Sequence, residues 1–170
     1  MSDSRIVALD VHYDDPRAHV ACVEFDRWDA PAPTRSFTTT VEDVAPYEPG
    51  SFFKRELPCL LAALALVREP PTVIVIDGYV HLSDDQRPGL GAHLYEAIEK
   101  RAVVIGVAKT AFVGSAFAHS LLRGQSAKPL YITAVGIDVE TAASNIASMH
   151  GAHRIPTLLK LVDTLCRAAK

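Results

Sequence analysis

Two aspartates, Asp10 and Asp77, lie within or directly after hydrophobic segments of the sequence. A carboxylate in such a position can bind a cation or take part in catalysis. Asp77 ends the apolar run Val73–Ile76 and is followed by Gly78. Asp10 lies within the run Arg5–Tyr13, on an alternating face that otherwise carries apolar side chains. Because an unpaired buried carboxylate is costly, each acid must meet water or hold a cation. The ordinary alternative for Asp77 is a turn that begins with an Asp-Gly pair.

A third acid, Glu56, lies near the start of a predicted helix. Apolar residues follow it at the spacing of a buried helical face, namely Leu57, Leu60, Leu61, Leu64 and Val67. Pro58 is tolerated in the first turn of a helix, so we expect the helix to begin near Phe53–Arg55. Glu56 would then lie in that same first turn.

The remaining patterns predict one α/β domain over residues 1–170. Three strands joined by turns come first, and then helices alternate with strands. The predicted strands are 5–13, 19–25, 36–41, 73–77, 103–107 and 130–135, with helices near 53–67, 90–100, after Asp138 and around 158–165. This is the order of a ribonuclease H-like fold, a mixed sheet with helices on both faces. We expect its first three strands to be antiparallel and the later ones parallel.

In this fold the first and fourth strands are parallel neighbours, so Asp10 and Asp77 would approach each other. Glu56 would reach them from the intervening helix. Converging carboxylates repel one another unless a divalent cation neutralises them. Oxygen ligands suit Mg²⁺ or Mn²⁺, and such an ion supports phosphodiester hydrolysis by activating water and stabilising the leaving oxygen. Read separately, the acids are a turn Asp, a helix N-terminal Glu and a strand Asp paired to an Arg.

Composition narrows the class of protein. A hydrophobic fraction of 49% and a charged fraction of 22% are those of an ordinary soluble domain. No apolar run is long enough to cross a membrane. The three cysteines are scattered and form no CxxC pair, so we expect neither a zinc site nor disulfides, and a cytoplasmic location.

The net charge of −3 argues against a general polyanion binder, but the charges are unevenly distributed. Residues 1–99 carry 8 basic and 17 acidic residues, whereas residues 100–170 carry 9 basic and 3 acidic ones. We expect the basic segment 100–128 to follow a phosphate backbone, with contacts from Arg123 and Lys128.

Several short motifs in this order resemble the endonuclease V family of inosine-directed nucleases. They are ALDVHY (8–13), PYEPGSFFKRE (46–56), VIDG (75–78), GLGAHL (89–94), IGVAK (105–109), KPLYITAVGIDVETA (128–142) and RIP (154–156). The resemblance covers nearly the whole chain. It implies a ribonuclease H-like fold and Mg²⁺-dependent cleavage of the second phosphodiester 3′ to hypoxanthine. It also implies that Asp10, Glu56 and Asp77 are the catalytic acids.

The resemblance assigns further roles. Tyr47, between Pro46 and Pro49, matches the wedge residue that helps to displace a base from the stack. Lys109 matches the lysine of the GVAK motif. Gly78 and Gly89 are expected walls of the base pocket, because a missing side chain permits close approach.

Some positions depart from the family pattern. Glu48 places a charge in the wedge motif, and Ile137 stands where the family often has a histidine beside the metal. The loop DGYVHLSDDQR lacks the second glycine and the basic pair of the usual motif, and His81 is the candidate replacement for its histidine. These departures preserve the acids and alter the segments that would face the substrate.

The leading hypothesis is therefore a Mg²⁺-dependent endonuclease that acts on inosine in DNA or RNA. One alternative is a nuclease of the same fold with a different lesion or structure preference. Another is a non-catalytic nucleic-acid-binding module. We expect the protein to bind nucleic acid, not to bind membranes and to be a monomer.

Overall fold

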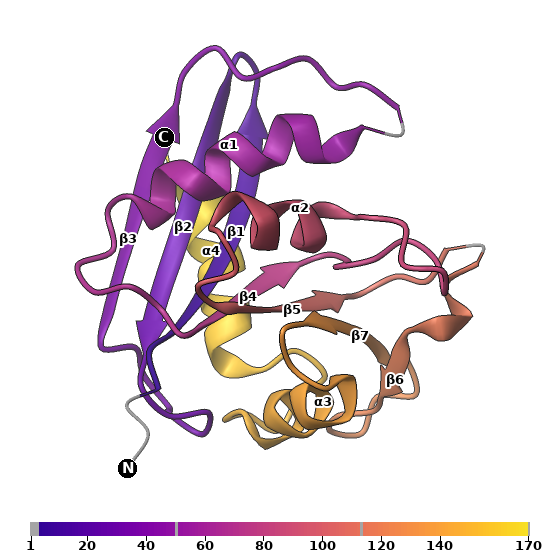
Figure 1. Ribbon diagram of the computed structural model, residues 1–170. Helices are drawn as coiled ribbons and strands as arrows, with labels where there is room; N and C mark the ends of the chain where they lie inside the picture. The colour runs from indigo at the N-terminus through magenta and orange to yellow at the C-terminus, as the bar shows by residue number, and fades with distance from the viewer. Residues whose placement is uncertain (1–3, 50, 113, 170) are drawn as a thin grey trace.

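The computed structural model describes residues 4–49, 51–112 and 114–169, and within these ranges the chain forms one seven-stranded sheet between two layers of helices (Figure 1). The strands lie in the order β3-β2-β1-β4-β5-β7-β6. Their bounds are β1 (Ile6–Asp14), β2 (Arg17–Phe25), β3 (Arg35–Val41), β4 (Val73–Asp77), β5 (Val103–Ala108), β6 (His119–Leu121) and β7 (Leu130–Val135).

The directions of the strands agree with the prediction except at one edge of the sheet. β1, β2 and β3 form an antiparallel meander, and β4 and β5 continue the sheet in parallel with β1. β7 pairs with β5 in the antiparallel direction, so the expectation of a parallel strand there was wrong. Parallel neighbours need a crossover, usually a helix. The chain between β5 and β7 instead forms a short 3₁₀ turn, η1 (Ser115–Phe117), and the edge strand β6.

Helices cover both faces of the sheet, as predicted. α1 (Phe52–Leu64) and α2 (Leu90–Ala97) pack over one face, and α3 (Val139–Ser148) and α4 (Thr157–Ala168) pack over the other (Figure 1). Each face has its own hydrophobic cluster, because alternate residues of the central strands point to opposite sides. None of the helices in the described part of the chain has the length and apolar character needed to traverse a lipid bilayer.

Helix α1 begins earlier than its proline suggested. It starts at Phe52, so Pro58 is its seventh residue and Glu56 lies in the second turn, not the first. A proline inside a helix removes one hydrogen bond and costs about 3 kcal/mol. The face that includes Cys59, Leu60 and Ala63 is buried against the sheet, and this burial outweighs that cost.

Strand β1 explains how Asp10 comes to lie near the α4 side of the sheet. Ile6 and Ala8 belong to the cluster under α3 and α4, and Val7 and Leu9 belong to the cluster under α1 and α2. Asp10 continues the alternation of Ile6 and Ala8. It therefore takes an acidic side chain toward α4 at the level where the apolar core ends.

The turn that follows β4 is held by a buried hydrogen bond. The backbone N–H of Val80 donates to Thr133 Oγ1 on β7 at 2.8 Å. A Cβ at Gly106 would lie 2.5 Å from the carbonyl oxygen of Gly78, so the glycine on β5 lets this turn sit directly on the sheet. Contacts with Gly106 on β5 and Thr133 on β7 thus fix the segment from Asp77 to Val80.

We predict that Thr133→Val lowers the free energy of unfolding by about 1–3 kcal/mol, because the buried N–H of Val80 loses its partner while the volume is conserved. Urea denaturation measures the change. Thr164→Val is the matched control, since the Thr164 hydroxyl donates to the carbonyl of Lys160 on an exposed part of α4. It should change the stability by no more than about 0.5 kcal/mol. Equal effects of the two substitutions would contradict this role of Thr133.

Candidate active site

Asp10 and Asp77 lie on adjacent strands, Asp10 in the middle of β1 and Asp77 at the carboxyl end of β4. The parallel register pairs Leu9 with Ile76, so the two acids follow the last paired residues. Asp10 is buried, with 7% of its surface exposed, and its Oδ1 accepts a hydrogen bond from the backbone N–H of Val11 at 2.9 Å. Asp77 is more open to solvent. The fold thus places the two acids side by side, as the sequence indicated.

Glu56 reaches the same place from α1. It lines a cleft together with Asp10, Asp77 and residues of β1. Glu56 is 6% exposed, and among the residues that the structure describes its Oε2 has no hydrogen-bond partner. An unpaired carboxylate oxygen in a buried position is costly unless something outside the protein satisfies it.

Arg55, the neighbour of Glu56, fixes the start of α1 against the β1–β2 hairpin. Its Nη2 lies 2.6 Å from Asp15 Oδ1, and its guanidinium stacks 3.9 Å from the centre of the Tyr13 ring. Because Arg55 is buried and held at two points, the adjacent Glu56 is held over the end of β1.

The electrostatics of the cleft are those of uncompensated negative charge. Burial, followed by the charge of Asp77, raises the pKa of Asp10 to about 7. Burial, followed by the charges of Asp10 and Asp77, raises the pKa of Glu56 to about 8. Both carboxyls therefore resist ionisation near neutral pH in the protein alone, and a cation between them would restore their charged forms.

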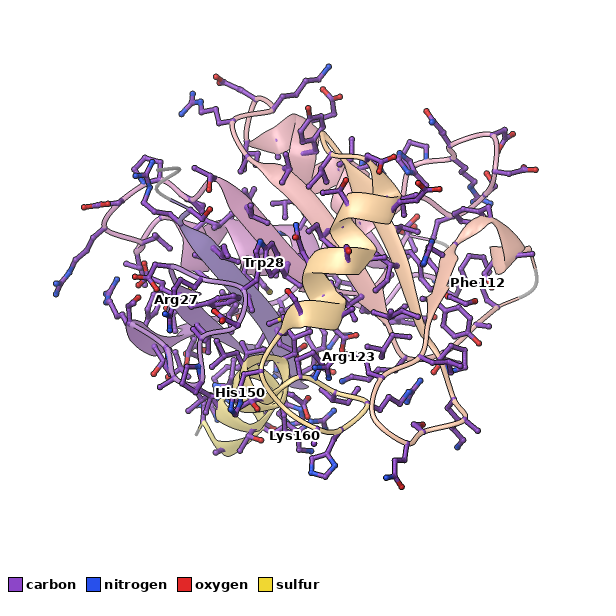
Figure 2. All side chains as sticks on the ribbon, turned by 90° about the horizontal axis from the view of Figure 1, so that it is seen from below. Arg27, Trp28, Phe112, Arg123, His150 and Lys160 are labelled. Atoms are coloured by element: carbon purple, nitrogen blue, oxygen red, sulfur yellow. The ribbon has the colours of Figure 1, made fainter. Side chains whose placement is uncertain are left out.

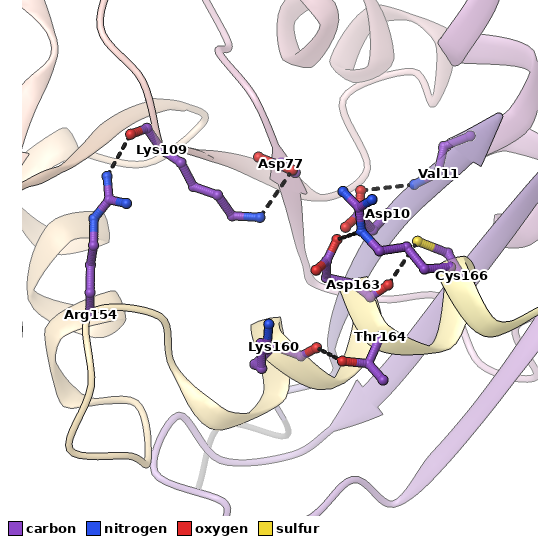
Figure 3. A network of polar contacts seen from close by, with 10 residues as sticks. Asp10, Val11, Asp77, Lys109, Arg154, Lys160, Asp163, Thr164 and Cys166 are labelled. Carbon is purple, nitrogen blue, oxygen red and sulfur yellow. Dashed lines mark hydrogen bonds and ion pairs between the residues drawn. The ribbon is translucent and has the colours of Figure 1, made fainter.

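A fourth acid, which the sequence analysis missed, comes from α4. Potential ligand atoms of Asp10, Asp163 and Cys166 all lie within 4.8 Å of one another (Figure 3). Burial alone would raise the pKa of Asp163. The hydrogen bond from Arg167 and the charge of Lys109 lower it by more, so the net shift of this pKa is downward. The available signal was an aspartate directly after Val162 on the buried stripe of the last helix.

Lys109 lies on the other side of the acids at the end of β5. Its Nζ is 3.5 Å from Asp77 Oδ2, and its carbonyl accepts a hydrogen bond from Arg154 (Figure 3). Arg154 also donates to the carbonyls of Lys128 and Pro129. The arginine of the RIP segment thus ties the end of β5 to the strand β7 and keeps Lys109 beside Asp77.

The segment with Tyr47 lies before α1 and is open to solvent. Tyr47 is 61% exposed, and both Pro46 and Pro49 are exposed as well. The charge of Glu48 is matched by Lys54, whose Nζ lies 3.2 Å from its carboxylate. The departure from the family motif is therefore partly neutralised within the loop.

A second, more apolar pocket adjoins Asp77. Gly78 and Gly89 both line it, together with side chains from α1 and α2 that include Phe52, Phe53 and His93. The His93 ring stacks on that of Phe53 at a centroid distance of 3.7 Å. A Cβ on Gly89 would lie 2.9 Å from the carbonyl oxygen of Tyr79, so this position needs glycine.

His81 does not share this lining. It is half-buried and forms an isolated bridge with Pro88, and burial lowers its pKa. Ile137 packs against the hydrophobic cluster beneath α3 and α4.

The structure gives Arg123 a different task from the expected phosphate contact. It is 6% exposed, and its guanidinium donates to the carbonyls of Met149, Gly151, His153 and Arg154 (Figure 2). A side chain that is buried and bonded in this way fixes the loop between α3 and α4. It is not available at the surface, and the expectation for Arg123 was wrong. Lys128 is exposed.

The donor set of the cleft fits a hard divalent cation. Carboxylate oxygens predominate, two of the carboxyls are buried, and one oxygen lacks any partner. Mg²⁺ and Mn²⁺ prefer such ligands, and a single bound ion would relieve the repulsion that raises the pKa values of Asp10 and Glu56. Cys166 adds a softer potential ligand beside Asp10 and Asp163.

The strand order, the helices on both faces and the acids on the neighbouring first and fourth strands define a ribonuclease H-like protein. The sequence profile of the family Endonuclease V matches residues 2–131. An endonuclease V from Streptomyces avermitilis is 32% identical over 187 aligned residues, which cover 97% of this chain and 80% of that protein. The chain therefore belongs to the endonuclease V family.

Solved structures agree with this assignment. The crystal structure of endonuclease V from Streptomyces avermitilis superposes with a TM-score of 0.75 at 28% identity, over 96% of this chain and 80% of that chain. Endonuclease V from Ciona intestinalis, in complex with a 24mer DNA that contains an inosine followed by a ribo-adenosine, gives a TM-score of 0.77 at 22% identity. That match covers 96% of this chain and 84% of the Ciona chain and shows the shared fold.

The pH dependence of stability tests this electrostatic description. A carboxyl whose pKa is raised on folding stabilises the folded state only while it stays protonated. Without divalent ions, the free energy of unfolding should therefore fall as the pH rises from about 4, where carboxyls of the unfolded chain lose their protons, to about 8, and level off above that range. The total fall should be at least about 1 kcal/mol. Urea titrations at several pH values in EDTA measure this. Glu56→Gln should flatten the fall, and an equal slope in both proteins would contradict the description.

Proposed function

We propose that this protein is a Mg²⁺-dependent endonuclease that hydrolyses a phosphodiester 3′ to a deaminated base, inosine, in DNA or RNA. The observation that carries the proposal is the buried, unpartnered Glu56 beside Asp10 and Asp77 in an open cleft. Buried acids that no protein cation neutralises favour a metal-dependent hydrolase over a binding module, which would not need to retain them. Membership of the endonuclease V family supports the same reaction.

Asp10, Glu56 and Asp77 would hold the ion, with Asp163 as a further ligand. When bound, Mg²⁺ or Mn²⁺ would lower the pKa of a water molecule and stabilise charge on the leaving oxygen. Lys109 orients the carboxylate of Asp77 and adds positive charge beside the phosphate that occupies the cleft. The buried partners of Asp10 exclude bulk water from one side of the site.

The pocket beside Asp77 is suited to a base that has left its stack. Phe52 and Phe53 give it aromatic walls, and Gly78 and Gly89 allow the backbone to approach the base closely. Enzymes that read a damaged base commonly extrude it from the helix and stack it against such side chains. The pocket borders the acids through Asp77, so an extruded base would place its own strand across the cleft.

We predict that Asp10→Asn and Asp77→Asn each lower the single-turnover cleavage rate of an inosine-containing strand by at least about a thousandfold, since loss of metal ligation removes several kcal/mol of transition-state stabilisation. The assay compares matched inosine and control oligonucleotides, as DNA and as RNA, with Mg²⁺ and with EDTA.

Asp26→Asn is the matched control, because Asp26 is an exposed aspartate just after β2 and lies outside the cleft. It should retain full activity. Undiminished cleavage in EDTA, or full activity of Asp77→Asn, would contradict metal-dependent catalysis. Equal cleavage of inosine and control strands would instead favour a nuclease with another preference.

Tyr47 separates a lesion nuclease from a general one. A wedge residue fills the gap that an extruded base leaves, and base–aromatic stacking is worth about 1–3 kcal/mol. Tyr47→Ala should therefore slow cleavage of a duplex inosine substrate by roughly ten- to a hundredfold. Single strands should be affected much less, because they have little stacking to break.

Tyr47→Phe keeps the ring and should behave like the wild type in both assays. Equal slowing of single and double strands by Tyr47→Ala would mean that Tyr47 contacts the base directly or supports the loop. No slowing on either substrate would exclude the wedge role.

A further inference from the structure

Arg167 occupies a place in the active-site cleft that the proposed catalysis leaves without a role. It lies in the last turn of α4 and lines the cleft together with Asp10, Glu56 and Asp77. Lys109 belongs to the other side of the acids, where it lines a small pocket with Asp10, Asp77 and Leu159. The two cations thus stand on opposite sides of the same carboxylates.

Each of the two basic side chains contacts one acid and has further N–H donors that are not used in that contact. Arg167 Nε lies 2.8 Å from Asp163 Oδ1, and Lys109 Nζ lies 3.5 Å from Asp77 Oδ2. A guanidinium has five N–H donors, and the bond to Asp163 uses the one on Nε. Within the described residues, Arg167 makes no other hydrogen bond, and its side chain is 64% exposed.

We propose that Arg167 contacts a backbone phosphate of the bound nucleic acid on the side of the acids opposite Lys109. This inference rests on the proposed nuclease function and names a further substrate-positioning residue for it. A phosphate in the cleft faces the three acids that line it, Asp10, Glu56 and Asp77, so ionised carboxylates repel the strand wherever no metal ion or basic side chain offsets them. The planar donors of an arginine suit bidentate contact with phosphate oxygens.

The bond to Asp163 gives this arginine a fixed direction. Asp163 is largely buried, with 15% of its side chain exposed, so it fixes the position of Nε, while the arginine side chain lines the cleft and is 64% exposed. Phe52 and Tyr13 line the same opening. The strand would pass from the pocket beside Asp77, over the acids, to the guanidinium of Arg167.

A simpler role is also consistent with the position. A basic residue in the last turn of a helix stabilises the helix dipole, and an Asp–Arg pair four residues apart adds to this. That role predicts a change in stability alone. Contact with phosphate predicts a change in the salt dependence of binding, because each neutralised phosphate releases counterions.

The test measures the affinity of wild type and Arg167→Gln for a single strand with a central inosine, over a range of salt concentrations. Ca²⁺ replaces Mg²⁺, and a gel confirms that the strand stays intact. We expect Arg167→Gln to weaken binding by about three- to tenfold at low salt and to flatten the logarithmic salt slope by about 0.7. Arg167→Lys should keep most of the slope.

A set of strands that each carry one neutral methylphosphonate locates the contact. Wild type should lose affinity at one position on one side of the inosine, and Arg167→Gln should show no loss at that position. Arg27→Gln is the matched control, because Arg27 is an exposed arginine that lies 3.7 Å from Asp29 and follows the end of β2 that pairs with the start of β1, outside the cleft. It should leave affinity, slope and scan unchanged.

The outcomes separate the inference from the proposed function. If the wild type cleaves the inosine strand and Arg167→Gln matches its slope and its methylphosphonate scan, the inference is overturned alone. A change in thermal stability without a change in slope or scan likewise overturns it. If the wild type neither binds nor cleaves the strand, the proposed function and this inference fail together.

Discussion

Repulsion between carboxylates that the fold forces together is the constraint on which the rest of this structure depends. The parallel register of β1 and β4 fixes Asp10 beside Asp77, and α1 adds Glu56 in a buried position. Burial and mutual repulsion raise the pKa values of Asp10 and Glu56 to about 7 and 8. Two buried carboxyls beside a third acid destabilise the folded chain at this point, so the surrounding elements must be held firmly.

Several side chains around the acids fix the segments that carry or flank them. Arg55 anchors the start of α1 through Asp15 and the Tyr13 ring. Arg154 ties the end of β5 to the neighbouring loop, and Arg123 holds the loop between α3 and α4 through backbone carbonyls. Thr133 fixes the turn after Asp77. These contacts keep the acids close without neutralising Asp10 and Glu56.

The sequence predicted the parts of the site that depend on local patterns. Asp10 and Asp77 were recognisable because each interrupts or ends a β-branched strand, and the order of elements made those strands neighbours. Asp163 and Arg167 were not recognisable, because their approach to Asp10 depends on how α4 packs across the sheet. The position of Pro58 led to a wrong prediction of where α1 begins, because burial of an apolar face outweighed the local preference against proline within a helix.

The fate of the basic residues shows why charge patterns along a sequence are a poor guide to a nucleic-acid interface. The excess of positive charge in the C-terminal part suggested a phosphate-binding segment, yet Arg123 and Arg154 turn inward to backbone carbonyls. A guanidinium has enough N–H donors to bond several backbone carbonyls at once, so an arginine can hold a loop in place.

The cations left facing the cleft are few, and two of them, Lys109 and Arg167, are held by acids of the site itself. With a net charge of −3, the protein has little general attraction for a polyanion. In the proposed function, affinity would arise locally, from a metal ion held by the carboxylates, from the cations beside them and from the pocket next to Asp77. A strand that does not fill the pocket would then find few other contacts to hold it.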